Sequence, residues 1–267
     1  MGVTAIILAA GRGSRLHPYT AECPKCLTEL GGLSLIDRHI ATLRAAGIQD
    51  IVIAAGYRAE MLQLPQTRQV INSRWAETNM VETLFAAEAA FGDDLIVAYS
   101  DIVYEPRVIE ALLGSPHATS VVVDRKWKSL WEVRFDDPLS DAESLTLDAY
   151  GLIRDIGNKV TDIDTIDAQY IGLMRFRGAG ISAMRNAYKR LCTELRPWNA
   201  KRPPEKAYMT DLLSEMIAGD LPVHAVVTDG GWIEVDTIRD YETYADMFAD
   251  GSIRRFYDPS GLVKKLQ

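Results

Sequence analysis

The chain has 267 residues, of which 48% are hydrophobic and 25% are charged, so it can bury a sizeable core as one large α/β domain. Its formal net charge of −8 excludes a broad nucleic-acid-binding surface, which requires a basic balance. Apolar runs stay shorter than a membrane span, the N-terminus lacks the basic segment of a signal peptide, and the three cysteines suit a reducing compartment; we therefore expect a cytoplasmic protein that binds no membrane.

The first half of the chain alternates between apolar strand patterns and amphipathic helix patterns. Strands are expected at 5–8, 51–55, 95–99 and 119–124, and helices at 35–46, 79–91 and 105–113. Such βαβ alternation predicts a mixed, mainly parallel sheet with helices on both faces, which is an α/β fold.

The pattern changes after residue 124. Short strand-like pieces at 130–135, 144–147, 152–156 and 169–176 predict a small antiparallel β insert over the main sheet. Helices are then expected at 178–194, 208–218 and 238–248, with strands at 223–227 and 232–235 and a proline-bearing loop at 195–206.

A glycine-rich turn follows the first strand, in the segment LAAGRGSRL. Gly11 and Gly13 leave backbone N–H groups exposed to form an anion-binding nest, and Arg12, Arg15 and Lys25 add positive charge suited to phosphate oxygens. An ordinary strand-to-helix turn is the simpler interpretation of the glycines alone. The segment does not fit a dinucleotide fingerprint or a P-loop, because Leu16 stands where the former needs its third small residue and no Gly-Lys-Ser/Thr follows.

Three carboxylates stand on or directly after apolar strands. Asp101 ends the strand at 95–99, and Glu234 and Asp236 lie on one face of the strand near 232–235. Magnesium prefers oxygen ligands, so carboxylates together with ligand phosphates make a metal site. The alternatives are that Asp101 supports a turn and that Asp236 caps the helix at 238–248.

The glycine-rich segment, Pro24-Lys25 and the helix start at 33–36 together resemble the signature of the nucleotidyltransferase superfamily that activates sugar phosphates and phosphocholine. The resemblance implies a Rossmann-like fold and Mg²⁺ held by Asp101 and Asp236, with Glu234 as a further candidate ligand. It implies Lys25, Arg15, Asp101 and Asp236 as the catalytic residues. The implied nucleotide-binding residues are Leu8, Ala9, Ala10, Gly11, Arg12, Gly13, Ser14, Arg15, Lys25, Asn79 and Ser100. Asn79 either reads the base or only caps its helix.

Segments 72–81, 98–106, 131–139, 156–159 and 169–173 are similar to a branch of phosphocholine and phosphonate cytidylyltransferases. This branch implies transfer of CMP from CTP to a small phosphonate or phosphate monoester, with release of pyrophosphate. A 2-aminoethylphosphonate-like acceptor is the first expectation; phosphocholine, phosphoglutamine and a sugar 1-phosphate are the alternatives. Products of such enzymes serve capsule or other cell-surface polysaccharide synthesis and phosphonate pathways.

Within a single domain spanning 1–267, the resemblance divides the chain by role. Residues 1–124 form the nucleotide-binding half, 125–177 the acceptor-side β insert, 178–250 the half that supplies the second metal carboxylate, and 251–267 a tail. The expected acceptor-binding residues are Trp131, Glu132, Arg134, Asp136, Asn158, Lys159 and Tyr170. Trp131 and Tyr170 have an alternative role as core residues of the small sheet.

Two other classes of protein stay open. A glycosyltransferase of related architecture usually carries an Asp-x-Asp pair, and residues 101–103 lack the second aspartate. A non-catalytic nucleotide sensor should have lost the lysine or a metal aspartate, and this chain keeps Lys25, Asp101 and Asp236. A homodimer is one option for assembly, with the apolar residues of the 253–267 tail packing on a partner subunit or on their own domain.

Overall fold

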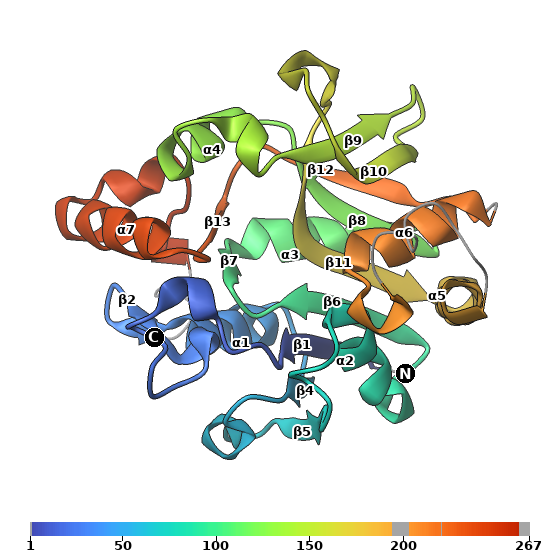
Figure 1. The fold of residues 1–267 in the computed structure, drawn as a ribbon, viewed down its shortest axis with the longest axis horizontal. Coiled ribbons are helices and arrows are strands. Elements are labelled where there is room, and N and C mark those ends of the chain that lie inside the picture. Colours follow the sequence, from blue (N-terminus) through green and yellow to red (C-terminus); the bar gives the residue numbers. More distant parts are fainter. Residues whose placement is uncertain (1, 194–202, 220, 262–267) are drawn as a thin grey trace.

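The computed structural model describes residues 2–193, 203–219 and 221–261. A seven-stranded sheet in the order β12-β8-β11-β6-β1-β4-β5 runs through the middle of the molecule (Figure 1). Its strands are β1 (Thr4–Ala9), β4 (Asp50–Ala55), β5 (Arg68–Ile71), β6 (Asp94–Tyr99), β8 (Thr119–Asp124), β11 (Gln169–Arg177) and β12 (His224–Thr228).

The sheet is mixed because one central strand runs against its neighbours. β1 pairs in parallel with β4 and β6, β4 with β5, and β8 with β12, whereas β11 pairs antiparallel with both β6 and β8. β1 and β6 are continuous apolar runs, as expected of strands that are covered on both faces. Leu8 pairs with Tyr99, so the residues that follow β1 and β6 emerge at the same sheet edge.

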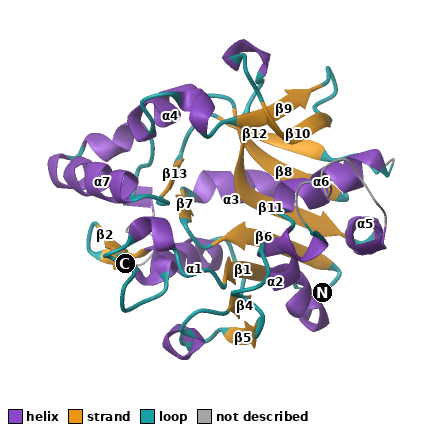
Figure 2. Ribbon diagram, viewed as in Figure 1, coloured by secondary structure: helices purple, strands orange, loops and turns teal. Residues whose placement is uncertain are grey.

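Helices cover both faces of the sheet and bury one core on each side (Figure 2). One core includes α1 (Leu35–Ala45), α3 (Pro106–Gly114) and α7 (Ile238–Asp250). The other includes α2 (Met80–Ala86), α5 (Ala179–Thr193) and α6 (Met209–Ala218). None of the helices in the described ranges has the length and apolar character needed to cross a bilayer.

Three two-stranded sheets and a short helix complete the fold. The sheets are β2 (Glu29–Leu30) with β3 (Leu33–Ser34), β7 (Ile102–Tyr104) with β13 (Trp232–Glu234), and β9 (Glu143–Leu147) with β10 (Ile153–Lys159). The helix is α4 (Lys128–Arg134). The pairing of β7 with β13 is the one that builds the site, since it brings the chain after Glu234 alongside Asp101, whose carbonyl accepts from Val235 N at 2.9 Å.

Two expectations for the middle of the chain were wrong. Residues 130–135 form most of α4 rather than a strand, because the buried side chains Trp127, Leu130, Trp131 and Arg134 recur at spacings of three and four, which is the helical period. The predicted strand at 169–176 does form, but as β11 it pairs with β6 and β8 inside the main sheet instead of belonging to the insert. Only β9 and β10 make the separate antiparallel pair of that segment.

The C-terminal segment packs on its own domain. Ile253, Phe256 and Tyr257 are buried in the core that also holds α1 and α7, and Phe256 O accepts from Gly231 N at 2.8 Å. Leu262 and most of the predicted loop at 195–206 lie outside the described residues.

Candidate active site

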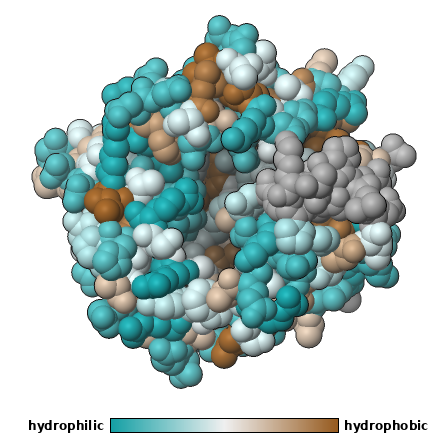
Figure 3. Space-filling model, in the orientation of Figure 1, coloured by the Kyte–Doolittle hydropathy of each residue, from teal (hydrophilic) through white to brown (hydrophobic). Residues whose placement is uncertain are grey.

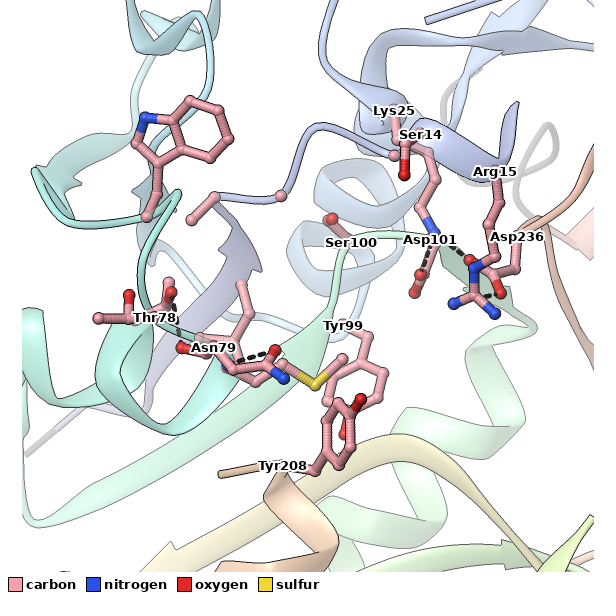
Figure 4. Close-up of a pocket in the computed structure, with 17 residues that line it drawn as sticks. Ser14, Arg15, Lys25, Thr78, Asn79, Tyr99, Ser100, Asp101, Tyr208 and Asp236 are labelled. Atoms are coloured by element: carbon pink, nitrogen blue, oxygen red, sulfur yellow. Dashed lines mark hydrogen bonds and ion pairs between the residues drawn. The ribbon is translucent and has the colours of Figure 1, made fainter. Parts of the chain in front are cut away.

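A pocket of about 380 Å³ opens at the sheet edge where β1 and β6 end. We call it the main pocket; the face of the molecule drawn in Figure 3 is hollowed near its centre, and Figure 4 shows the residues lining the pocket. They are Leu8, Ala10, Gly11, Gly13, Ser14, Arg15, Lys25, Trp75, Thr78, Asn79, Met80, Thr83, Tyr99, Ser100, Asp101, Tyr208 and Asp236.

The glycine-rich turn forms one wall of the main pocket and has a conformation that requires glycine. Gly13 has a φ of 71°, and a Cβ placed there would lie 2.6 Å from Cβ of Lys25. The hydroxyl of Thr20 donates to Gly13 O at 2.8 Å and holds the turn closed. The absence of a side chain at Gly13 therefore lets Lys25 pass directly behind the turn and enter the pocket.

Lys25 joins the two predicted metal carboxylates. Its Nζ lies 2.5 Å from Asp101 Oδ2 and 2.8 Å from Asp236 Oδ1, and all three side chains are at most 14% exposed. Burial by itself would lower the pKa of Lys25, but the charges and hydrogen bonds of Asp101 and Asp236 outweigh it and raise that pKa above its ordinary value. The amino group is therefore a permanent cation at the base of the pocket.

Arg15 supplies a second cation on the open side of the cluster. Its guanidinium lies 2.7 Å from Asp236 Oδ2, while 67% of its side chain is exposed. Burial would raise the pKa of Asp236, yet the neighbouring Lys25 and Arg15 hold it below its ordinary value. Figure 4 shows the Lys25 and Arg15 side chains converging on Asp101 and Asp236.

The two carboxylates fit a hard divalent cation. Oδ1 of Asp101 is buried and has no hydrogen-bond partner among the described residues, so this oxygen is a free acceptor at the pocket floor. Asp236 is held ionised beside it. The described part of the chain contains no group of three or more His, Cys, Asp or Glu side chains placed to bind a metal, so a cation here would take its other ligands from substrate and water.

Glu234, the further candidate metal ligand, does not line the main pocket with Asp101 and Asp236. It forms an ion pair with Arg134 at 2.7 Å and lines a second pocket rather than the main one. Burial raises the pKa of Glu234 to about 7, although Arg134 opposes this shift.

The second pocket, about 180 Å³, adjoins the main one, and we call it the adjoining pocket. Both are lined by Arg15, Met80, Tyr99, Tyr208 and Asp236. The rest of its lining is Trp131, Asp141, Glu143, Gln169, Tyr170, Ile171, Gly172, Thr210, Trp232 and Glu234. The adjoining pocket is thus aromatic and acidic, with Arg15 and Asp236 at its boundary with the main pocket.

Most of the predicted nucleotide-binding residues line the main pocket. Ala9 instead lies in the core, and the guanidinium of Arg12 lies 5.6 Å from the centre of the Tyr57 ring, outside the pocket lining. Asn79 lines the pocket and also caps α2, since its Oδ1 accepts from Met80 N at 2.9 Å. Asp236 is not the cap of α7, because Thr237 holds that position.

The predicted acceptor residues divide into two groups. Trp131 and Tyr170 line the adjoining pocket, whereas the others line neither pocket of the site. Glu132 and Lys159 are exposed, Asp136 pairs with Arg239 at the surface, Asn158 donates to Asp155, and Arg134 is buried in ion pairs. These side chains point outward or into the core and so do not line the pockets, although Arg134 contacts Glu234, which lines the adjoining pocket.

Sequence reasoning missed several residues of the site. Asp141 and Glu143 bring acid groups to the adjoining pocket, and Tyr99 and Tyr208 stand between the two pockets. The Asp-x-Glu spacing at 141–143, at the start of a strand, was the available signal, because alternation puts both acids on one side. Tyr208 gave no such signal, since it comes from the distant α6 region.

A glycine turn, a buried lysine and two carboxylates thus lie together at the carboxyl edge of a mixed sheet. Residues 5–143 match the family described as the MobA-like NTP transferase domain, and the chain belongs to this family of nucleotidyltransferases. The family generally uses a divalent metal ion, in agreement with the two carboxylates.

The chain is similar in sequence to several curated proteins, two of which match different shares of its length. The CTP:phosphoglutamine cytidylyltransferase of Campylobacter jejuni is 37% identical over 251 residues, which cover 90% of this chain and 98% of that protein. The CMP-5'-(3-aminopropyl)phosphonate synthase of Streptomyces rubellomurinus is 29% identical over 136 residues, 48% of this chain and 22% of that one.

Solved structures share the fold at low sequence identity. The CTP:phosphocholine cytidylyltransferase from Streptococcus pneumoniae superposes with a TM-score of 0.70 at 20% identity, covering 92% of this chain and 99% of that one. The inositol-1-phosphate CTP transferase from T. maritima gives 0.70 at 18% identity, covering 94% and 97%. The Rossmann-like nucleotidyltransferase fold expected from the sequence is confirmed.

Proposed function

We propose that this enzyme transfers CMP from CTP to a small phosphonate or phosphate acceptor that carries an amino or quaternary ammonium group, in a Mg²⁺-dependent reaction that releases pyrophosphate. The observation that carries the proposal is the ion-paired cluster of Lys25, Asp101 and Asp236, which lines the main pocket and reaches the adjoining pocket through Asp236. Relatives whose names contain CTP or CMP support cytidine as the base.

The main pocket suits the nucleotide. Amides of the turn at Gly11–Gly13 and the exposed guanidinium of Arg15 would bind the β- and γ-phosphates, which leave as pyrophosphate. Lys25 would lie beside the α-phosphate, and Asn79 beside the base. When bound by Asp101 and Asp236, Mg²⁺ would supply further neutralisation of phosphate charge.

The transfer needs little proton chemistry. A phosphonate or phosphate oxygen of the acceptor, already anionic near neutral pH, attacks the α-phosphorus, and the bond from that phosphorus to the oxygen bridging to the β-phosphate breaks. Catalysis then depends on positioning and on neutralising the charges of two anions that approach each other. Lys25 lines the main pocket beside Asp236, and Arg15 lines both pockets, so each places a cation near the proposed reacting groups.

The adjoining pocket suits the acceptor. Its composition indicates which group the acceptor carries at the end opposite its phosphonate or phosphate. Asp141, Glu143 and Glu234 bring three carboxyl groups to a pocket that also holds the rings of Trp131 and Trp232. Carboxylates and indole faces both favour an ammonium group. Lys25, beside the α-phosphate, would hold the anionic end of the acceptor. An aminoalkyl phosphonate has such a cationic end and such an anionic end, as do phosphocholine and phosphoglutamine.

The test is to incubate the protein with each NTP, Mg²⁺ and a panel of acceptors, and to follow pyrophosphate. The panel contains 2-aminoethylphosphonate, phosphocholine, phosphoglutamine, glucose 1-phosphate and ethylphosphonate, which lacks the amine. We expect pyrophosphate with CTP and an amine-bearing acceptor. Turnover with glucose 1-phosphate alone would instead favour a sugar-1-phosphate nucleotidyltransferase, and no pyrophosphate with any pair would favour the nucleotide sensor.

A further inference from the structure

Arg134 and Asp240 form an ion pair that is closed to solvent behind the metal-binding carboxylate. Nε of Arg134 donates to Asp240 Oδ1 at 3.1 Å and its terminal nitrogen donates to Oδ2 at 3.3 Å. The two side chains are 1% and 0% exposed. Neither residue lines the main or the adjoining pocket, so neither is placed to touch a substrate.

Asp240 also fixes the backbone that carries Asp236. Its Oδ2 accepts from Asp236 N at 3.0 Å and from Thr237 N at 2.9 Å, while the Thr237 hydroxyl accepts from Asp240 N at 3.1 Å. One carboxylate oxygen therefore binds the two amides at the start of α7. The direction in which the Asp236 side chain leaves the backbone depends on these two bonds.

Arg134 holds the other end of the same segment. A terminal nitrogen of its guanidinium lies 2.7 Å from Glu234 Oε2, and the guanidinium carbon lies 5.2 Å and 5.0 Å from the ring centres of Trp131 and Phe135. A single guanidinium from α4 thus anchors Glu234 directly and Asp236 through Asp240. Because α4 also supplies Trp131, the same helix supports the wall of the adjoining pocket.

We propose that Arg134 and Asp240 are positioning residues that hold segment 234–236 so that Asp236 faces Lys25 and Glu234 faces the adjoining pocket. The inference rests on the proposed metal-binding role of Asp236 and adds the device that orients it. A buried ion pair contributes little net stability compared with apolar packing, so its geometry is the stronger reason for its presence. A lysine at 134 is a point charge and cannot match the forked contacts to Asp240 and Glu234 together.

The test compares Arg134→Lys and Asp240→Asn with the wild type, and uses Arg175→Lys as a matched control. Arg175, itself buried, makes a similarly forked pair with the partly exposed Asp94, at 2.8 and 2.6 Å, at the opposite end of β6 from Asp101. Hydrogen exchange of the Asp236 and Thr237 amides is measured first, in the ligand-free protein. Turnover of CTP is then measured against Mg²⁺ concentration.

In both variants we expect about tenfold faster exchange of these two amides, and in Arg175→Lys no change there. We also expect kcat to fall by about tenfold or more and the half-saturating Mg²⁺ concentration to rise, with KM for CTP little changed. Wild-type exchange at Asp236 and Thr237 in a folded Arg134→Lys or Asp240→Asn protein would overturn the inference. Exchange does not require turnover, so a failure of the proposed reaction is distinguishable from a failure of this inference.

Discussion

The amino group of Lys25 lies 2.5 Å from Asp101 and 2.8 Å from Asp236, although these partners are 76 and 211 residues away along the chain. The lysine neutralises two carboxylates that would otherwise repel each other in a half-closed pocket. The same group lines the main pocket and pairs with Asp236, which lines both pockets. It therefore connects the stability of the ligand-free protein with the proposed chemistry.

Replacing Lys25 by methionine tests both roles. We expect turnover to fall by at least about 100-fold, because a fixed cation beside the reacting phosphate is lost. The free energy of unfolding should fall by about 1–3 kcal/mol, since Asp101 and Asp236 lose their partner. Mg²⁺ should restore more stability to this variant than to the wild type. Lys128→Met, at an exposed pair with Asp164, is the control and should change neither quantity. Full activity in Lys25→Met would contradict the assignment.

Asp101→Asn tests the metal carboxylate while keeping the size of the side chain. We expect a fall in kcat of about 100-fold or more and a higher Mg²⁺ requirement, because an amide is a weaker ligand for a hard cation. A titration of turnover against Mg²⁺ measures both effects. Asp164→Asn, at the exposed end of a surface pair, should behave as the wild type. An unchanged Mg²⁺ requirement in Asp101→Asn would place the metal elsewhere.

Asp141→Asn tests recognition of the acceptor's amine. Loss of one charge that faces an ammonium should raise KM for the amine-bearing acceptor by about tenfold, and KM for CTP should stay within about twofold. Glu132→Gln is the matched control, because Glu132 is exposed and lines neither pocket. Equal effects of the two substitutions on the acceptor's KM would exclude the adjoining pocket as the amine site.

Gly13→Ala tests the close passage of Lys25 behind the glycine turn. The substitution requires an alanine at a φ of 71° with its Cβ 2.6 Å from Cβ of Lys25, so we expect a loss of about 1–3 kcal/mol in the free energy of unfolding. At Gly11 an added Cβ meets no atom within 4 Å, and Gly11→Ala should leave unfolding unchanged. Chemical denaturation of both variants measures the difference. The account of the turn is wrong if the two variants are equally stable.

His39 gives a prediction for pH. Burial lowers its pKa to about 3 from an ordinary 6.5, and Tyr104 shares a 2.8 Å hydrogen bond with it. Below pH 6.5 the unfolded chain binds a proton that the folded protein does not, so stability is present above that pH and falls as pH decreases toward 3. The loss between pH 7.5 and 5.0 should be about 2 kcal/mol.

Denaturant titrations at the two pH values measure that loss, with variants as comparison. His39→Gln should remove most of the loss assigned to this residue, whereas the exposed His17→Gln should keep it. Identical pH dependence in His39→Gln and the wild type would contradict the assignment.

Local signals were sufficient to predict most of the fold. Continuous apolar runs mark β1 and β6, and helical periodicity marks α1 and α7, because each buries its apolar residues against neighbours. Residues around Trp131 were predicted as a strand because their short apolar run was ambiguous between two periods. The place of β11 between β6 and β8 depends on long-range pairing, to which its own residues give no local signal.

The residues of the site that belong to short local motifs could be predicted from the sequence. The residues that the fold brings together from distant segments were harder to predict. The glycine turn, Lys25 and the strand-end acids follow from local patterns and resemblance. Arg134 was predicted to bind the acceptor, but it is buried against Asp240, and its partner comes from α7, more than a hundred residues later. Asp141 shares the adjoining pocket with Glu234 only because separate segments meet there.

The most direct test of the central claim is ³¹P NMR of a reaction containing this protein, CTP, Mg²⁺ and 2-aminoethylphosphonate or phosphoglutamine. We predict the appearance of pyrophosphate together with a CMP–acceptor conjugate in equal amounts, and neither product with Lys25→Met. Pyrophosphate without a conjugate, or no change in the CTP resonances with any amine-bearing acceptor, would contradict the claim that the two pockets, which share Arg15 and Asp236 beside Lys25, form one cytidylyl-transfer site.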